Sequence, residues 1–238
     1  MNNLSVALRN GSWRLIKTRL PFLANGIRRM RMALKDRFYK KTFQTIYERN
    51  IWGDRHSISG TGSNLFQTEA IRRELPRLTK ELGVNSMLDI PCGDFFWMQE
   101  VKLGLQYIGG DIVPALVESN QKLYSDKEHT FARLDLIGGP LPKADLIFCR
   151  DCLVHFSYDS IFRALDNMRR SGSKYLLTTT FIVKSRNDDI ATGDWRPINL
   201  QLPPFNFPPP LLLIDEKCPF GGYEDKHLGL WNVSDIPV

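Results

Sequence analysis

Short apolar runs alternate with amphipathic stretches along residues 86–181, and this alternation is the strongest pattern in the sequence. Five apolar runs have the length and residue types of β-strands: 86–90, 106–111, 130–135, 144–149 and 174–181. Three stretches between these runs are predicted to be helices: 95–101, 114–123 and 158–170. Alternating strands and helices predict a parallel sheet that is covered by helices on both faces.

The two ends of this α/β pattern differ from its middle. On the C-terminal side, residues 182–210 form a long proline-rich segment, and the apolar runs 211–214 and 228–233 are predicted to be two closing strands. On the N-terminal side, residues 65–82 have helical spacing, with Pro76 inside the predicted helix. We therefore expect an open, doubly wound, mostly parallel sheet of the Rossmann-like class.

The net charge of +6 is concentrated in the first 41 residues. This arm carries eleven Lys or Arg residues and one acid, so the remaining residues carry a net charge of −4. A mildly acidic body argues against a nucleic-acid-binding face on the core. Within the arm, Ile27, Met30, Leu34 and Phe38 recur at helical spacing among basic residues, which predicts a basic helical N-terminal extension.

A basic amphipathic helix can serve several purposes. It can lie on an anionic membrane surface, pack its apolar stripe on the domain, or act as an Arg-rich organellar transit segment, although this arm contains little serine. Arg9, Arg14 and Arg19 interrupt the apolar runs, so no secretory signal is expected. No uninterrupted apolar run approaches the roughly 18–20 residues that span a bilayer. With four cysteines and no disulfide framework, the sequence predicts a cytoplasmic protein with peripheral membrane contact through the arm.

Composition divides the chain into three parts. We expect a basic arm at 1–41, lead-in helices and a loop rich in Gly and Ser at 42–84, and the α/β domain at 85–238. The loop spans residues 50–63 and contains one large aromatic residue, Trp52. It is either a plain connector or a lid over a bound ligand, with Trp52 as its apolar cover.

The stretch 87–94 has the sequence of a buried strand that runs into a tight loop. The strand ends at the acidic Asp89, the chain turns at Gly93, and the apolar residues after the loop predict the first turns of a helix. Such an arrangement brings a ligand close to backbone N–H groups and a helix N-terminus. A carboxylate attracts a cationic ligand group and repels an anionic one such as a pyrophosphate. Asp89 therefore predicts a ligand with a cationic group.

Acidic residues follow four of the predicted strands at or near their ends: Asp89, Asp111, Asp135 and Asp151. Ligands of open parallel sheets bind beyond the carboxyl ends of the strands. Asp111 lies eighteen residues after Gly93, a distance at which an acid after the second strand accepts both hydroxyls of a ribose. The carboxylates therefore predict a ligand site at this edge of the sheet.

The residues beside these acids suit the other parts of a nucleoside. Ile112 follows Asp111 and can pack on an adenine ring. Asp135 can accept a hydrogen bond from an exocyclic adenine amine, with Leu136 beside it.

Four segments along residues 80–238 resemble the motifs of the class I S-adenosylmethionine-dependent methyltransferases: 88–94, 110–112, 134–136 and 145–151. The resemblance implies a seven-stranded sheet whose last strand is antiparallel, which fits the two closing strands. It implies S-adenosylmethionine as the cofactor. It also implies roles for six residues: Asp89 and Gly93 at the methionine end, Asp111 at the ribose, Asp135 at the adenine, and Arg150 and Asp151 in the cleft where donor and acceptor meet.

The loop departs from the family pattern at Pro91 and Phe95, where the family usually or often has glycine. Proline has no N–H, so Pro91 leaves the cofactor-binding loop with one donor fewer. A nicotinamide enzyme would need G-x-G-x-x-G, whereas this loop has a single glycine. Cys149 and Cys152 have the spacing of a metal half-site, but no second close pair of Cys or His completes a zinc site, so no metal is expected.

Methyl transfer to a hydroxyl needs a base, and His155 follows the fourth strand at the edge of the expected cleft. We expect His155, with Asp151 nearby, to be catalytic. The alternative is a histidine that caps the loop or packs under the helix at 158–170.

A polar acceptor has a predicted site in the segment 192–199. Trp195 can stack on a sugar or another ring, Arg196 can pair with a charge, and Asn199 and Trp52 complete the set. We therefore expect a methyltransferase that O-methylates a small polar molecule or glycan. Two alternatives remain open: a protein or RNA methyltransferase that docks through the basic arm, and a non-catalytic module that keeps the fold as an interaction surface.

Overall fold

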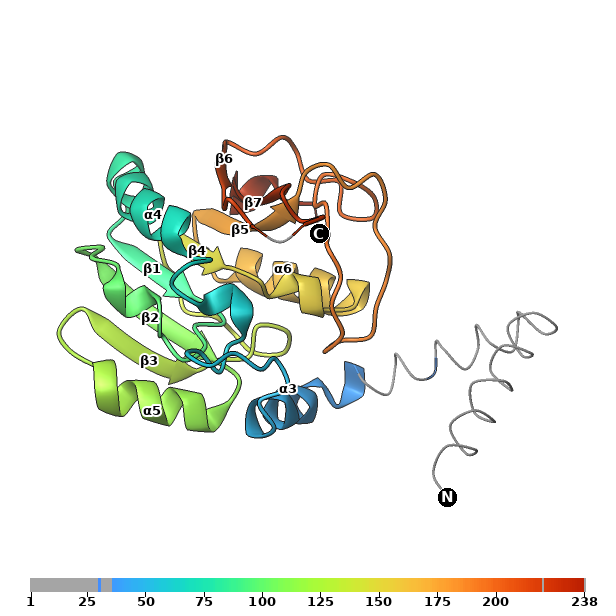
Figure 1. The fold of residues 1–238 in the computed structure, drawn as a ribbon. Helices are drawn as coiled ribbons and strands as arrows, with labels where there is room; N and C mark the ends of the chain where they lie inside the picture. Colours follow the sequence, from blue (N-terminus) through green and yellow to red (C-terminus); the bar gives the residue numbers. More distant parts are fainter. Residues whose placement is uncertain (1–29, 31–35, 220, 238) are drawn as a thin grey trace, which may run out of the picture.

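The computed structural model describes residue 30 and residues 36–219 and 221–237, which contain a seven-stranded sheet with helices on both faces (Figure 1). The strands are β1 Ser86–Asp89, β2 Gln106–Asp111, β3 His129–Arg133, β4 Leu146–Cys149, β5 Tyr175–Phe181, β6 Leu212–Asp215 and β7 Lys226–Asn232. The α-helices in these residues are α3 Tyr39–Glu48, α4 Glu69–Leu82, α5 Pro114–Tyr124 and α6 Tyr158–Arg170.

The strand order is β3-β2-β1-β4-β5-β7-β6. β1 lies between β2 and β4 and is parallel to both, so Leu88 pairs with Ile108 on one side and with Ile147 on the other. β7 runs antiparallel to its neighbours β5 and β6. The predicted Rossmann-like sheet, mostly parallel with an antiparallel last strand, is confirmed, and the predicted strand limits agree with the structure to within two residues.

Both faces of the sheet are buried, because alternate side chains of each central strand enter different apolar layers. Met87 and Leu88 are neighbours on β1, and both are 0% exposed. Met87 belongs to the layer that contains the apolar residues of α4 and Val117 of α5, whereas Leu88 belongs to the layer of α6. The centre of the sheet is therefore fixed from both sides, which leaves the loops at the carboxyl ends of its strands as a place for a ligand.

The predicted helix at 95–101 is wrong. Phe95 has a left-handed backbone (φ 58°), and the regular structure after it is only the 3₁₀ turn Met98–Glu100. The ring of Phe95 is buried, and its centroid lies 5.1 Å from the ring centroids of both Tyr107 and Phe131. The apolar spacing of this segment therefore reflects side chains that are buried individually, not one face of a helix.

The N-terminal elements differ from the expected division of the chain. α3 crosses the boundary expected between 41 and 42, and α4 begins at Glu69, four residues later than predicted, because 65–68 form turns. Met30 and Phe38 of the expected basic helix are 58% and 53% exposed, whereas its other two apolar residues lie outside the described residues. Membrane contact through the arm stays a prediction. Among the described residues, no helix has the length and apolar character needed to span a membrane.

Candidate functional site

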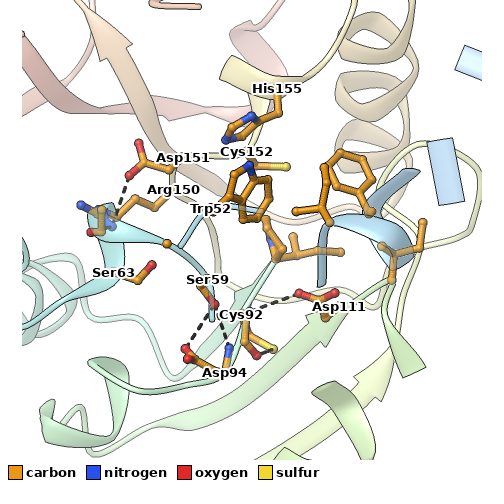
Figure 2. A pocket seen from close by; sticks show the side chains of 18 of the residues that line it. Trp52, Ser59, Ser63, Cys92, Asp94, Asp111, Arg150, Asp151, Cys152 and His155 are labelled. Atoms are coloured by element: carbon orange, nitrogen blue, oxygen red, sulfur yellow. Dashed lines mark hydrogen bonds and ion pairs between the residues drawn. The ribbon is translucent and has the colours of Figure 1, made fainter. Parts of the chain in front are cut away.

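A cavity of about 490 Å³ lies where the carboxyl ends of β1, β2 and β4 meet α3 and the loop 52–63, here called the cover loop (Figure 2). This volume is within the range of small-molecule sites. Twelve residues that the sequence singled out line the cavity: Trp52, Asp89, Pro91, Gly93, Asp111, Ile112, Asp135, Leu136, Arg150, Asp151, His155 and Trp195. The other two, Arg196 and Asn199, do not line it.

Asp111, at the end of β2, is oriented by the backbone around it. The N–H of Gly93 donates to Oδ2 at 3.2 Å, and the N–H of Val113 donates to Oδ1 at 2.9 Å. Burial raises the pKa of Asp111 to about 6 in spite of these hydrogen bonds. Each carboxylate oxygen retains a lone pair, because a carboxylate offers about four acceptor sites. Asp111 can therefore accept two further donors from a ligand.

Asp89, at the end of β1, is a buried acid with one hydrogen bond from the described residues. The hydroxyl of Tyr107 donates to Oδ2 at 2.6 Å. Burial raises the pKa of Asp89 to about 7, since the charged form loses its hydration. A cationic group in the cavity would favour the carboxylate. Pro91 follows in the same wall of the cavity and is preceded by a cis peptide bond.

The cover loop is docked on the loop after β1 through Asp94. The Oγ atoms of Ser57 and Ser59 donate to Oδ1 at 3.0 and 3.2 Å, and the N–H of Ile58 donates to Oδ2 at 2.9 Å. Ser59 Oγ in turn accepts from the N–H of Asp94 at 3.1 Å. A Cβ on Gly93 would collide with Ser59 Oγ, so this close approach needs glycine. The loop of Gly and Ser therefore forms a wall of the cavity, with Trp52 facing His155 (Figure 2).

Asp135 is turned towards α3. Its Oδ2 accepts from the hydroxyl of Tyr39 at 2.6 Å and lies 2.8 Å from Lys40 Nζ, while its Oδ1 accepts from the N–H groups of Ile137 and Gly138 at 3.1 and 2.9 Å. Although burial raises the pKa of Asp135, the hydrogen bonds from Lys40 and Tyr39 hold it below its usual value. Four protein donors use the four acceptor sites of the carboxylate. The expected bond from Asp135 to an adenine amine would have to displace one of them.

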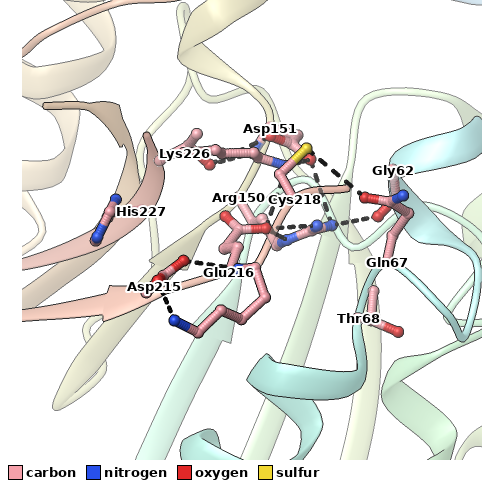
Figure 3. A network of polar contacts seen from close by, with 12 residues as sticks. Gly62, Gln67, Thr68, Arg150, Asp151, Asp215, Glu216, Cys218, Lys226 and His227 are labelled. Carbon is pink, nitrogen blue, oxygen red and sulfur yellow. Dashed lines mark hydrogen bonds and ion pairs between the residues drawn. The ribbon is translucent and has the colours of Figure 1, made fainter. Parts of the chain in front are cut away.

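Four charged side chains, three of them buried, form a network beside the cavity (Figure 3). Arg150 donates to Glu216 Oε2 through Nε at 3.0 Å and Nη2 at 2.7 Å, and Lys226 Nζ lies 3.1 Å from the same oxygen. Lys226 Nζ also donates to Asp151 Oδ2 at 2.6 Å. Arg150 Nη1 donates to the carbonyl of Gly62 at 2.8 Å. The network therefore ties the end of β4 both to the cover loop and to the segment between β6 and β7.

The network surrounds Asp151 and Arg150, which both line the cavity as expected. Burial raises the pKa of Asp151, but the ion pairs with Lys226 and Arg150 outweigh it and hold this pKa well below its usual range. Asp151 therefore stays ionised at neutral pH and, because its pKa is low, is a weak base. The donors of Arg150 are directed at Glu216 and Gly62 instead of at a ligand. Sequence reasoning missed Glu216 and Lys226, because an isolated acid and an isolated lysine near the closing strands have no distinctive spacing.

His155, in the 3₁₀ turn Leu153–His155, has the geometry of a neutral base. Its Nδ1 lies 2.9 Å from the carbonyl oxygen of Asp194. Because a carbonyl oxygen can only accept, we assign the proton to Nδ1, which leaves a lone pair on Nε2. Burial lowers the pKa of His155, so the imidazole is neutral at pH 7. The indole of Trp52 lies against the imidazole, with a centroid distance of 4.8 Å.

Arg196 and Asn199 support the loops around the site instead of contacting an acceptor. The Nη1 and Nη2 of Arg196 donate to the carbonyls of Leu153 and Phe156, both at 2.8 Å, so the guanidinium braces the turn that carries His155. Asn199 Nδ2 donates to two backbone carbonyls of the segment after β5. The prediction that Arg196 and Asn199 bind the acceptor is therefore corrected, because the surrounding backbone engages their donors.

Three aromatic side chains, Phe181, Trp195 and Tyr223, form an aromatic wall of the cavity near the network. The ring of Trp195 meets that of Tyr223 edge-on at 5.1 Å and that of Phe181 at 6.2 Å. All three residues line the cavity, and 43% of Trp195 remains exposed. Tyr223 and Phe181 were not expected from the sequence, since single aromatic residues on a loop and at a strand end give no recognisable pattern.

No family model matches the sequence, and no curated protein matches it. The structure is similar to that of the N-methyltransferase NodS from Bradyrhizobium japonicum WM9, with 16% identity, 72% of this chain and 98% of that chain covered, and a TM-score of 0.51. It is also similar to magnesium protoporphyrin IX methyltransferase (ChlM) from Synechocystis PCC 6803 with bound SAH, with 15% identity, 63% and 74% covered, and a TM-score of 0.45. Human N-acetylserotonin methyltransferase in complex with SAM is 17% identical, with 55% of this chain and 45% of that chain covered and a TM-score of 0.39. This chain therefore spans less than half of the human enzyme.

The fold agrees with what the sequence motifs implied. The strand order has β1 at its centre and one antiparallel strand, β7, and the cavity lies at the carboxyl ends of the parallel strands. The similarity to NodS extends over nearly the whole of that protein. The chain therefore has the fold of the class I S-adenosylmethionine-dependent methyltransferases.

Proposed function

We propose that the protein is an S-adenosylmethionine-dependent methyltransferase that O-methylates a small polar molecule or glycan. The observation that carries the proposal is that three groups with unused acceptor capacity line one cavity: the carboxylates of Asp89 and Asp111 and the Nε2 of His155. Two of these groups suit a cofactor with an ammonium group and a ribose, and the third suits a hydroxyl that must lose a proton.

The residues at the strand ends fit the cofactor. Asp89 retains acceptor sites for an ammonium group, and burial raises its pKa although Tyr107 and Arg150 lower it, so a further cation would favour its carboxylate. Asp111 is held by two backbone donors in an orientation that can accept ribose hydroxyls. Ile112 and Leu136 line the cavity as apolar walls for an adenine ring. When bound, S-adenosylmethionine supplies a methyl group on a sulfonium sulfur.

His155 is the residue that favours an oxygen acceptor. A hydroxyl must lose its proton as it gains a methyl group, and a neutral imidazole with Nε2 as acceptor can take that proton. The carbonyl of Asp194 keeps the proton of the resting imidazole on Nδ1. Arg196 braces the turn, so the base is held in position by buried contacts.

Isothermal titration with S-adenosylhomocysteine tests the cofactor part of the proposal. We expect the wild-type protein to bind, and Asp111→Asn to bind about 10–100-fold more weakly, since a hydrogen bond to a charged acceptor contributes about 1.5–3 kcal/mol. Asp159→Asn on α6 makes the same chemical change on a side chain that is 74% exposed, and it should bind like the wild type. No binding by the folded wild-type protein would sink the proposal.

A further inference from the structure

Within the described residues, the ion pair between Asp151 and Lys226 leaves one N–H donor of the ammonium and one lone pair of the carboxylate unused. An ammonium group has three N–H donors, and Lys226 directs two of them at Asp151 Oδ2 (2.6 Å) and Glu216 Oε2 (3.1 Å). Both cations lie on Oδ2 of Asp151, whereas the protein donor near Oδ1 is the Thr179 hydroxyl at 3.4 Å. Because both side chains line the cavity and 28% of the Asp151 side chain is exposed, a ligand can reach this pair.

The surrounding charges indicate a neutral ligand at this pair. Arg150 and Lys226 carry two positive charges, and Asp151 and Glu216 carry two negative charges, all within one hydrogen-bonded network. The network is therefore neutral as a whole, so a charged ligand would gain little from it. A hydroxyl group both donates and accepts a hydrogen bond, which matches the remaining lone pair of Asp151 Oδ1 beside the third N–H of Lys226.

The pair is close to the proposed base. Asp151 and His155 are four residues apart, on the segment that turns back after β4, and both line the cavity. The charge of Asp151 acts on the imidazole and opposes the effect of burial on the pKa of His155. A ligand that places one hydroxyl at Asp151 would thus bring a second of its groups near His155 Nε2. The two groups can therefore engage two hydroxyls of one ligand.

The rest of the wall suits the carbon skeleton of a sugar. Trp195 and Tyr223 present aromatic surface to the cavity next to the network, and Trp52 covers His155. Carbohydrate rings have apolar C–H faces and polar hydroxyl edges, so an aromatic surface beside a carboxylate and an ammonium fits both parts. A planar aromatic acceptor would use the rings but would leave the ion pair without its hydroxyl.

We propose that this end of the cavity is a subsite for a sugar ring with two adjacent hydroxyls, one held between Asp151 and Lys226 and the other facing His155 Nε2. This inference rests on the proposed function, because it assigns the acceptor of the same site. It makes Asp151 and Lys226 substrate-binding residues that select which hydroxyl meets the base. Trp195 is the platform for the ring.

Saturation-transfer NMR with defined small molecules tests the subsite by binding alone. The probes are methyl α-D-mannopyranoside and methyl β-D-galactopyranoside, which carry adjacent hydroxyls, with cyclohexanol as the single-hydroxyl control and catechol as the planar aromatic diol. Spectra are recorded at millimolar probe with and without S-adenosylhomocysteine. We expect transfer to the ring protons of at least one glycoside, and several-fold weaker transfer to cyclohexanol and to catechol.

Three variants locate the binding on the protein. Asp151→Asn removes the acceptor charge, and Trp195→Ala removes a partly exposed ring, so that one informative variant remains if the first fails to fold. Each should reduce glycoside transfer several-fold, whereas Asp159→Asn should leave it unchanged. Three results would overturn the proposal. They are no saturation transfer from the folded wild-type protein to either glycoside, stronger saturation transfer to catechol than to the glycosides, and unchanged saturation transfer to the glycosides in Trp195→Ala. Because the glycoside spectra are read separately from cofactor titration, loss of one does not imply loss of the other.

Discussion

Replacing Gly93 by alanine tests how the cover loop is held over the cavity. Gly93 has a left-handed backbone (φ 57°), and a Cβ there would collide with Ser59 Oγ. A side chain in this conformation costs about 1–2 kcal/mol by itself. Displacing Ser59 also breaks its two hydrogen bonds with Asp94, at 3.1 and 3.2 Å, one of which is made to a carboxylate. Their combined loss is about 2–4 kcal/mol.

Gly83 provides a matched control for the backbone effect. It follows α4 with nearly the same conformation (φ 62°), but a Cβ there would meet nothing within 4 Å. In urea unfolding, Gly83→Ala should lower the free energy of unfolding by about 1–2 kcal/mol, and Gly93→Ala should lower it by about 2–4 kcal/mol more. In a Ser59→Gly background the additional cost of Gly93→Ala should largely disappear. Equal losses for the two alanine variants would refute the docking argument.

Further predictions concern three groups in or beside the cavity. NMR titration of His155 should give a pKa below 6.5, because burial disfavours the imidazolium. The ¹⁵N shifts of the ring should show the proton on Nδ1. A titration midpoint above 6.5 would contradict the assignment of His155 as a neutral base. Tyr39→Phe should lower the free energy of unfolding by about 1.5–3 kcal/mol, since Asp135 loses a donor, whereas Tyr47→Phe on the same helix should change it little. Burial raises the pKa of Asp89 from 3.8 to about 7, so the native state holds a proton that the unfolded chain lacks, and stability should fall as the pH rises across that window. The ammonium group of S-adenosylhomocysteine favours the carboxylate of Asp89, so its binding at about pH 6 should release protons from Asp89. Titration calorimetry in buffers of different ionisation enthalpy measures this release. No release would contradict contact between the ligand and Asp89.

The predictions that succeeded depend on backbone periodicity and chain order. Apolar runs of strand length placed all seven strands, and they are clearest in a central strand such as β4, because a strand buried on both faces needs an unbroken run of apolar residues. The same runs placed Asp89 and Asp111, because the carboxyl ends of parallel strands lie at one edge of a sheet. The helix predicted at 95–101 failed, because the left-handed Phe95 and its aromatic neighbours are a matter of packing and leave no period in the sequence.

Residues far apart in the sequence decided the chemistry of the individual side chains. Asp135 was expected to face a ligand, but Tyr39 and Lys40, nearly a hundred residues earlier, take its acceptor sites. Asp151 was expected to be catalytic beside His155, and its ionised state depends on Lys226, seventy-five residues later. Such pairings depend on which loops meet in space, and nothing in the local spacing of either partner records them.

The sequence by itself therefore determined the sheet, the edge at which the cavity lies, and the acids and the histidine that reach this edge. The tertiary structure alone decided which of these groups keep free lone pairs. Asp89, Asp111 and the Nε2 of His155 keep them, whereas the carboxylate of Asp135 is engaged by distant partners. The physical reason is that strand ends are set by local apolar runs, whereas hydrogen-bond capacity and charge depend on every group that folding brings within about 3 Å.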